Sequence, residues 1–220
     1  HIEILRGPSS IFNRGGTSGG IINVITDIIS ENKYDNEVIK LDYTTVNNGY
    51  GHNFLFKKNY LNANIFFSIN NKHMDNYNIP NGSLLSEDTG LELSTLANSD
   101  HKNQNTSFGL SFPREWGYFG FSFENTDGVY GLPYHAEEEE EEEGHHEEEE
   151  EHRLFIKTET ETYTLKGKFN TVPLFNSIDY SFRNSNSFLK EHEEDGSASL
   201  NSNSISFDFN FNLDDELYEK

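Results

Sequence analysis

The feature that most constrains this chain is a repeated alternation of aromatic and small polar residues. The stretch 205–211 places four apolar side chains at alternate positions, with serine, aspartate and asparagine between them. The same period of two occurs in residues 108–112, 119–123 and 178–182. Because successive side chains of a β-strand point to opposite faces, this pattern predicts strands with one apolar and one polar face.

The alternation predicts an all-β, antiparallel fold. Only 33% of the residues are hydrophobic, yet 14% are aromatic, including 18 Phe and 11 Tyr. A soluble β-sandwich and a transmembrane β-barrel both have alternating strands, but a polar inner face with an aromatic outer face is typical of the barrel. The pattern alone leaves both architectures open. We expect strands over residues 37–46, 50–57, 61–73, 105–112, 117–127, 153–169, 175–189 and 199–212.

The connections between these strands alternate in length. Those at 58–60, 113–116 and 170–173 are short, whereas those at 74–104 and 128–152 are long. Outer-membrane barrels have short turns at one rim and long loops at the other, so this alternation favours a barrel.

Composition excludes several other classes of function. A net charge of −22 argues against a nucleic-acid binder, which needs a positive surface for phosphates. The absence of cysteine removes disulfide frameworks, thiolate catalysis and Cys-based zinc modules. The glycine-rich stretch 15–20 lacks the lysine of a phosphate-binding loop, and no spacing identifies a nucleophile with its base. We therefore expect no enzyme.

The first segment carries a specific resemblance. Residues 2–10 read IEILRGPSS and residues 15–26 read GGTSGGIINVIT. They resemble the end of the plug domain of TonB-dependent outer-membrane receptors, which have an IEVLRGP stretch, a short turn and then GGVINVIT. One departure is the Phe-Asn-Arg at 12–14, where the family usually has Tyr-Gly.

The resemblance implies a domain organisation and a location. Residues 1–33 would be the C-terminal end of a plug domain, and residues 34–220 the N-terminal portion of a barrel, with about eight of its expected 22 strands. The chain would be a fragment of a longer protein in the bacterial cell outer membrane. In the family, Glu3 and Arg6 help tie the plug to the barrel wall. The plug-motif residues read as structural are Glu3, Arg6, Gly7, Pro8, Gly19, Gly20 and Asn23.

An acidic, histidine-containing run interrupts the alternating part of the chain. Residues 137–151 include 12 glutamates, interrupted only by Gly144, His145 and His146, and His135 and His152 flank the run. The glutamates alone are typical of a solvated low-complexity loop. Imidazole and carboxylate together suit Zn²⁺, and a His-rich tract is a compositional signal for metal binding. We expect many weak ligands that gather a divalent cation.

A second resemblance supports this interpretation. The YGLPYH of residues 130–135, the Glu/His run and the KEHEEDG of residues 190–196 resemble the zinc-uptake branch of these receptors. That branch has a YGLPxH stretch, an acidic His-rich loop and a later Tyr-x-His-acid-acid segment, although position 190 holds Lys in place of Tyr. By strand parity, the loops near 74–104, 128–152 and 190–198 would be extracellular. The predicted metal ligands are His135, His145, His146, His152, His192, Glu193 and Glu194.

Four other histidines are weaker candidates. His101 lies beside an aspartate in the long 74–104 connection, whereas His1, His52 and His73 are isolated and fit ordinary wall or surface positions.

These observations predict TonB-dependent active transport of a divalent metal ion, with zinc first and no tightly bound cofactor. The implied partners are the TonB energy-transducing protein, whose contact region would lie outside this fragment, and outer-membrane lipid. Cu²⁺ would compete for the same ligands, since it binds them more strongly. One alternative is a receptor for a siderophore or other organic chelate. Another is a soluble acidic β-sandwich, a cation-binding or adhesion module that would use carboxylates for Ca²⁺.

Overall fold

The structure is a computed structural model that describes residues 2–5, 21–24, 26–83, 93–133, 154–172, 175–193 and 196–213. Regular structure in these ranges consists of β-strands. Among the same residues there is no helix with the length and apolar character needed to cross a membrane. The strands are β1 (Ile2–Leu5), β2 (Ile21–Val24), β3 (Asn36–Thr44), β4 (Gly49–Tyr60), β5 (Ala63–Met74), β6 (Tyr77–Asn78), β7 (Thr95–Leu96), β8 (His101–Arg114), β9 (Gly117–Gly131), β10 (Phe155–Val172), β11 (Phe175–Glu193) and β12 (Gly196–Leu213).

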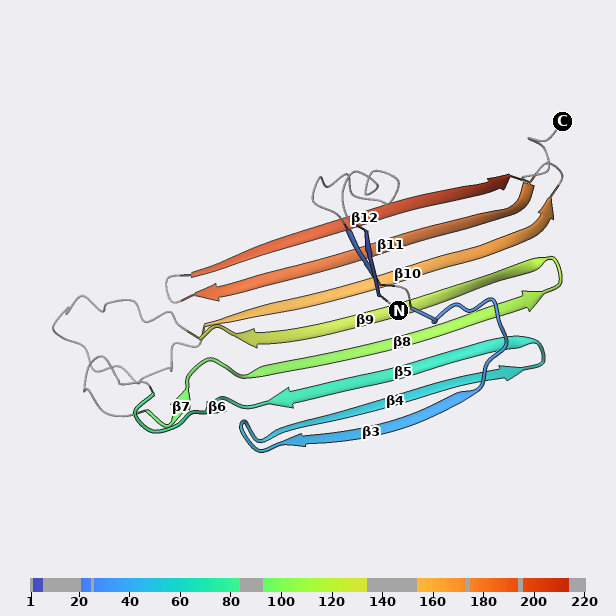
Figure 1. The fold of residues 1–220 in the computed structure, drawn as a ribbon. Helices are drawn as coiled ribbons and strands as arrows, with labels where there is room; N and C mark the ends of the chain where they lie inside the picture. Colours follow the sequence, from blue (N-terminus) through green and yellow to red (C-terminus); the bar gives the residue numbers. More distant parts are fainter. Residues whose placement is uncertain are drawn as a thin grey trace.

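One antiparallel sheet contains the eight longest strands. Its order is β12-β11-β10-β9-β8-β5-β4-β3, so each long strand lies beside the next long strand in the chain. Figure 1 shows them in a single layer, with β3 and β12 at its two edges. Two small separate pairings, β1 with β2 and β6 with β7, complete the described sheets.

The ends of the sheet form two different rims. At the turn rim, β4 joins β5, β8 joins β9 and β10 joins β11 through short connections (Figure 1). The first of these uses Leu61 and Asn62, both with positive φ (48° and 61°), as in the two-residue turns that fit the twist of a hairpin. At the opposite end, the loop rim, the long connections leave β5 and β9.

The all-β prediction and the eight predicted strands are confirmed, but several strands extend further toward the loop rim than the sequence pattern indicates. β8 begins at His101, β9 ends at Gly131, and β11 continues to Glu193. The predicted loop near 190–198 is therefore mostly strand, with only residues 194 and 195 between β11 and β12. The extensions of β8 and β11 are polar on both faces, so they lack the apolar contrast on which the period-two signal depends.

The register separates two chemically different faces. One row across the sheet consists of Leu110, Phe121, Leu165, Phe182 and Phe207, which are direct cross-strand partners. The adjacent row, one residue closer to the turn rim on each strand, consists of Ser111, Gly120, Lys166, Ser181 and Asp208. The first row belongs to what we call the apolar face and the second to the linker face. The residues that enter β3, 26–35, form the linker and lie against the second face.

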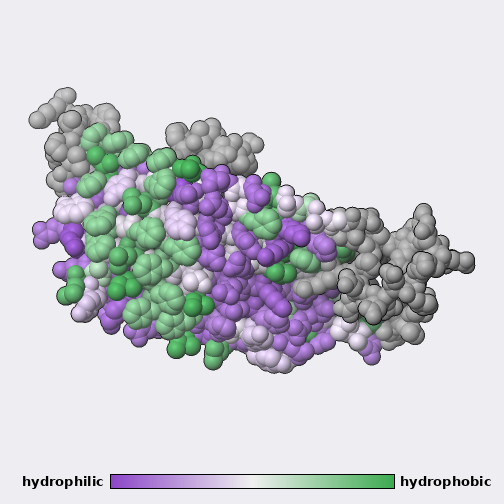
Figure 2. Space-filling model, turned by 180° about the vertical axis from the view of Figure 1, so that it is seen from behind, coloured by the Kyte–Doolittle hydropathy of each residue, from purple (hydrophilic) through white to green (hydrophobic). Residues whose placement is uncertain are grey.

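The apolar face is exposed rather than packed. Phe207 and Phe209 are 68% and 63% exposed, so these side chains are not packed against a second sheet as a β-sandwich would require. Figure 2 shows the apolar side chains gathered next to the turn rim, followed by a hydrophilic zone toward the loop rim. We call the first zone the apolar belt; it includes Phe108, Leu110, Phe119, Phe121, Phe123, Tyr163, Leu165, Phe169, Ile205, Phe207, Phe209 and Phe211.

Rings within the belt contact one another across strands. Phe182 and Phe207 have centroids 4.8 Å apart, and Phe123 and Tyr163 are 5.0 Å apart. In contrast, the buried hydrophobic side chains of the described residues include Ile28 and Ile29 of the linker and Phe66 and Tyr118 of the sheet. The sheet thus buries apolar side chains where the linker crosses it and exposes them on the opposite face.

Candidate functional site

The predicted metal-binding run leaves and rejoins the sheet at one place on the loop rim. β9 ends at Gly131 and β10 begins at Phe155, and these two residues are direct cross-strand partners. The Leu132 N–H also donates a hydrogen bond of 3.1 Å to the Leu154 carbonyl oxygen. Phe155 in turn pairs with His192 of β11. The chain therefore leaves the sheet at the end of β9 and rejoins it at the start of β10, next to β11, which carries the second predicted metal-binding segment.

His192 lies on the apolar-face side of β11. It shares strand parity with Phe182, and its ring centroid is 5.1 Å from that of Phe155. The imidazole is exposed. In the structure His192 therefore lies at the rim, turned away from the face that the linker covers.

Of the other predicted ligands, Glu193 lies in the described part of the chain. Glu193 is the last residue of β11 and pairs with Gly196. The remaining predicted ligands, His135, His145, His146, His152 and Glu194, lie outside the described residues. Within the described ranges, no group of three or more ligating side chains is placed to hold a metal ion.

Two of the weaker histidine candidates, His73 and His101, lie near the loop rim but in different surroundings. His73 stacks on Tyr50 with centroids 5.1 Å apart, and its Nε2 is 3.1 Å from Oδ1 of Asp75. His101 stacks on Tyr130 at 6.2 Å on the linker face. The structure does not bring these two histidines together with His192.

The plug-motif prediction is covered by the structure only at its two strands. Glu3 of β1 is the cross-strand partner of Asn23 of β2, in an antiparallel pairing. Arg6, Gly7, Pro8, Gly19 and Gly20 lie outside the described residues.

Buried polar side chains of the sheet contact the linker where it crosses its face of the sheet. Asn64 of β5 is 1% exposed and Ser111 of β8 is fully buried. The Ser111 hydroxyl donates to the Ser30 carbonyl oxygen at 2.8 Å, and the Asn64 amide donates to the Asn32 carbonyl oxygen at 2.9 Å. Two buried polar side chains of the sheet therefore use their hydrogen-bonding groups on the linker backbone.

Two glycines allow the linker to approach the sheet closely. A Cβ added to Gly109 would lie 2.4 Å from the Ile28 carbonyl oxygen, and one added to Gly120 would lie 2.5 Å from Cγ2 of Ile29. Only residues without a side chain fit beneath these isoleucines. We call Asn64, Gly109, Ser111 and Gly120 the linker seat.

Ion pairs hold the linker at both sides of the seat. Lys57 of β4 lies 3.7 Å from Asp27, and Lys168 of β10 lies 3.8 Å from Glu31. The Lys57 ammonium is also 5.1 Å from the centroid of the Tyr34 ring. Because these lysines come from strands on either side of the seat, the linker is fixed across several strands.

Two titratable groups respond to this environment. Burial, with a smaller contribution from Asp27, raises the pKa of Tyr34 to about 12, so the phenol stays neutral. The Asn59 N–H donates to the Asp35 carboxylate at 2.9 Å and, with Lys58, lowers the pKa of that group. A lowered pKa means that this contact is present at neutral pH and is lost as the pH falls through it.

The residues of the linker seat were not among the sequence-predicted site residues. A signal for two of them is nevertheless present, since Gly109 and Gly120 interrupt strands that are otherwise rich in Phe. A glycine inside a strand often marks a place where another backbone approaches closely. Asn64 and Ser111 carry no comparable signal.

Comparison with known proteins identifies no relative, since no protein-family model and no curated protein matches this chain.

Replacing Gly109 by alanine should loosen the linker. The new Cβ would collide with the Ile28 backbone oxygen, which cannot move without displacing the linker. We expect the amides of residues 26–35 to exchange hydrogen about tenfold faster, which corresponds to about 1.4 kcal/mol. Hydrogen–deuterium exchange followed by mass spectrometry measures this.

The matched control is Gly128→Ala at the other end of the same face. There the added Cβ would meet side-chain atoms of Tyr130 and Thr158, which can shift. Equal exchange of residues 26–35 in both variants and the unchanged protein would contradict the role assigned to the seat.

Proposed function

We propose that this protein is a TonB-dependent outer-membrane transporter for a divalent metal ion, with zinc as the first cargo to test. The observation that carries the proposal is the polarity of the large sheet. Its exposed face is apolar and aromatic, while the face toward the linker is lined by serine, threonine, asparagine and lysine. This is the reverse of a soluble sheet and is the arrangement that a membrane-spanning barrel requires.

The dimensions of the sheet support a membrane setting. A strand needs about 9–11 residues to cross a bilayer, and β8 to β12 have 14, 15, 18, 19 and 18 residues. From Ile205 to Phe211 the apolar belt extends about 20 Å along β12, at 3.3–3.4 Å per residue. The rest of each long strand would project beyond the bilayer on the loop-rim side.

The proposal for the cargo rests on the loop rim. The connection between β9 and β10 contains 12 glutamates and four histidines, and β10 begins beside His192. Such a concentration of negative charge raises the local concentration of cations and repels anionic chelates. The imidazoles of this segment would supply nitrogen ligands, which bind Zn²⁺ well, whereas Ca²⁺ and Mg²⁺ favour oxygen ligands. Capture at this rim would precede transfer to a tighter site, and coupling to TonB would release the ion inward.

A positive charge placed in the apolar belt should destabilise the protein in a bilayer. Leu165 lies in the middle of the belt on β10 and is 46% exposed. If that face contacts lipid, Leu165→Arg should lower the free energy of unfolding by about 2–4 kcal/mol. Denaturant-induced unfolding from phospholipid vesicles measures the difference.

Glu161→Arg is the control on the same strand and face, beyond the belt and exposed. It should change the unfolding free energy by less than about 1 kcal/mol. Equal effects of the two substitutions, or a protein that stays dissolved without detergent or lipid, would rule out the membrane assignment.

Removing the histidines of the acidic run should reduce zinc binding. Combined alanine substitution of His135, His145, His146 and His152 leaves the glutamates in place, so the loss isolates the nitrogen ligands. We expect a several-fold drop in zinc bound in calorimetry and in zinc taken up by cells that carry the transporter. Binding should also weaken on acidification, because a protonated imidazole has no lone pair for the metal.

His52→Ala is the matched control, since His52 is an exposed histidine of β4, away from the acidic run. Its zinc uptake should equal that of the unchanged protein. Undiminished uptake in the fourfold variant would contradict zinc capture by this run. Weak, multi-site heat with free Zn²⁺ alongside tight binding of a siderophore would favour the organic chelate instead.

A further inference from the structure

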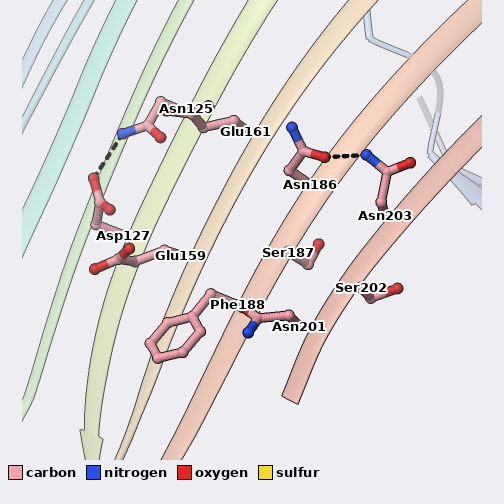
Figure 3. Close-up of a pocket in the computed structure, with 10 residues that line it drawn as sticks. All are labelled: Asn125, Asp127, Glu159, Glu161, Asn186, Ser187, Phe188, Asn201, Ser202 and Asn203. Carbon is pink, nitrogen blue, oxygen red and sulfur yellow. Dashed lines mark hydrogen bonds between the residues drawn. The ribbon is translucent and has the colours of Figure 1, made fainter. Parts of the chain in front are cut away.

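A polar hollow lies on the outward face of the sheet, between the apolar belt and the loop rim. It has a volume of about 590 Å³ and is formed by four neighbouring strands, β9 to β12 (Figure 3). The register arranges its side chains in two adjacent rows. The first row is Asn125, Glu161, Asn186 and Asn203, and the second is Asp127, Glu159, Phe188 and Asn201.

Some of these side chains hold one another in place. The Asn125 amide donates to Oδ2 of Asp127 at 2.7 Å, and the Asn203 amide donates to the Asn186 side-chain oxygen (Figure 3). Both donors come from amide groups that have a second N–H and an acceptor oxygen. The hollow therefore presents planar amide and carboxylate groups in a fixed spacing set by the strands.

This set of groups matches the chemistry of a sugar. Carboxylates accept hydrogen bonds from hydroxyl groups, while amides both donate and accept, so vicinal hydroxyls can be bound through two atoms of one side chain. The Phe188 ring supplies an apolar patch against which the C–H face of a pyranose can pack. Small polar sites of this kind fix the orientation of a ligand, and the apolar part contributes contact area.

The charge of the hollow limits which sugar fits. Asp127, Glu159 and Glu161 contribute three carboxylates. The next row toward the loop rim contains Lys157, whose Nζ is 2.6 Å from Oε1 of Glu159, and its cross-strand partner Lys190. The residues that line the hollow itself include these carboxylates and no lysine, so a phosphorylated or otherwise anionic sugar would be repelled there. The favoured ligand is therefore an uncharged saccharide.

The position of the hollow indicates how the sugar would be delivered. The next row toward the turn rim contains Phe123, Tyr163 and Ile205, which belong to the apolar belt. A lipid whose chains cover the belt would hold its headgroup at the level of the hollow. The apolar belt and the polar hollow are thus continuous, as a surface for an amphiphile must be.

We propose that this hollow binds the uncharged sugar headgroup of a membrane glycolipid. The inference rests on the membrane setting of the proposed function and adds a ligand class that transport itself does not require. Because the groups of the hollow are exposed or half-buried, binding would be weak in solution and would depend on the high local concentration that the bilayer gives to the headgroup.

The test uses the protein in phosphatidylcholine vesicles that contain digalactosyldiacylglycerol. After flotation and gentle extraction, native mass spectrometry measures how much of each lipid stays bound. We expect the galactolipid to be enriched over phosphatidylcholine, and we expect the enrichment to vanish in the double variant Glu161→Ala, Asn186→Ala. The control is Ser204→Ala on β12, which is exposed on the linker face and should keep the enrichment.

The possible results separate this inference from the proposed function. Failure of the protein to float with vesicles would overturn the membrane assignment and, with it, the lipid source of the sugar. Flotation without galactolipid enrichment, or with enrichment that survives in the double variant, would overturn only the sugar site. Displacement of the galactolipid by an equal concentration of free digalactose would show that the lipid anchor is irrelevant and would also overturn the proposal. Heat-modified migration on gels confirms that each variant is folded.

Discussion

The whole arrangement depends on the alternation that sends large apolar side chains to one face of the sheet and small polar side chains to the other. Because direct cross-strand partners share a face, the register of one strand fixes that of all the others, and Leu110, Phe121, Leu165, Phe182 and Phe207 fall in one row. A slip of one residue in any strand would place its apolar side chains among the serines and lysines of the linker face. The exposed apolar belt and the polar surface under the linker are two consequences of the same constraint.

Where the linker crosses this polar face, the side chains of linker and sheet form a packed interior. The linker's two isoleucines need a surface without side chains, which Gly109 and Gly120 provide, and its carbonyl groups need donors, which Asn64 and Ser111 provide. Steric fit and hydrogen bonding therefore select the same position for the linker. Lys57 and Lys168 reinforce it from either side, although exposed ion pairs contribute little on their own.

Sequence reasoning could predict the strands wherever apolar and polar side chains contrast, as in 205–211, and it could connect the acidic run to a loop between two strands. It could not predict the extension of β8 back to His101, where Lys102 and Gln104 occupy the outward positions and remove the contrast. The complete linker seat could not be predicted from the sequence either. Ser30 and Ser111 are 81 residues apart, and only the register of β8 decides that the Ser111 hydroxyl meets the linker.

The unequal heights of the strands give the loop rim its particular chemistry. β3 has 9 residues whereas β11 has 19, so the sheet rises on the side of β9 to β12. Along β10, Phe155 lies about 27 Å from Tyr163 at the edge of the apolar belt, at 3.3–3.4 Å per residue. If the belt lies in lipid, this distance places Phe155, where the chain rejoins the sheet after the acidic run, well away from the hydrocarbon, in which a dense negative charge would be costly. The same extended strands carry the polar hollow on their outward side. If the belt lies in lipid, these strands would present polar groups to the headgroup region.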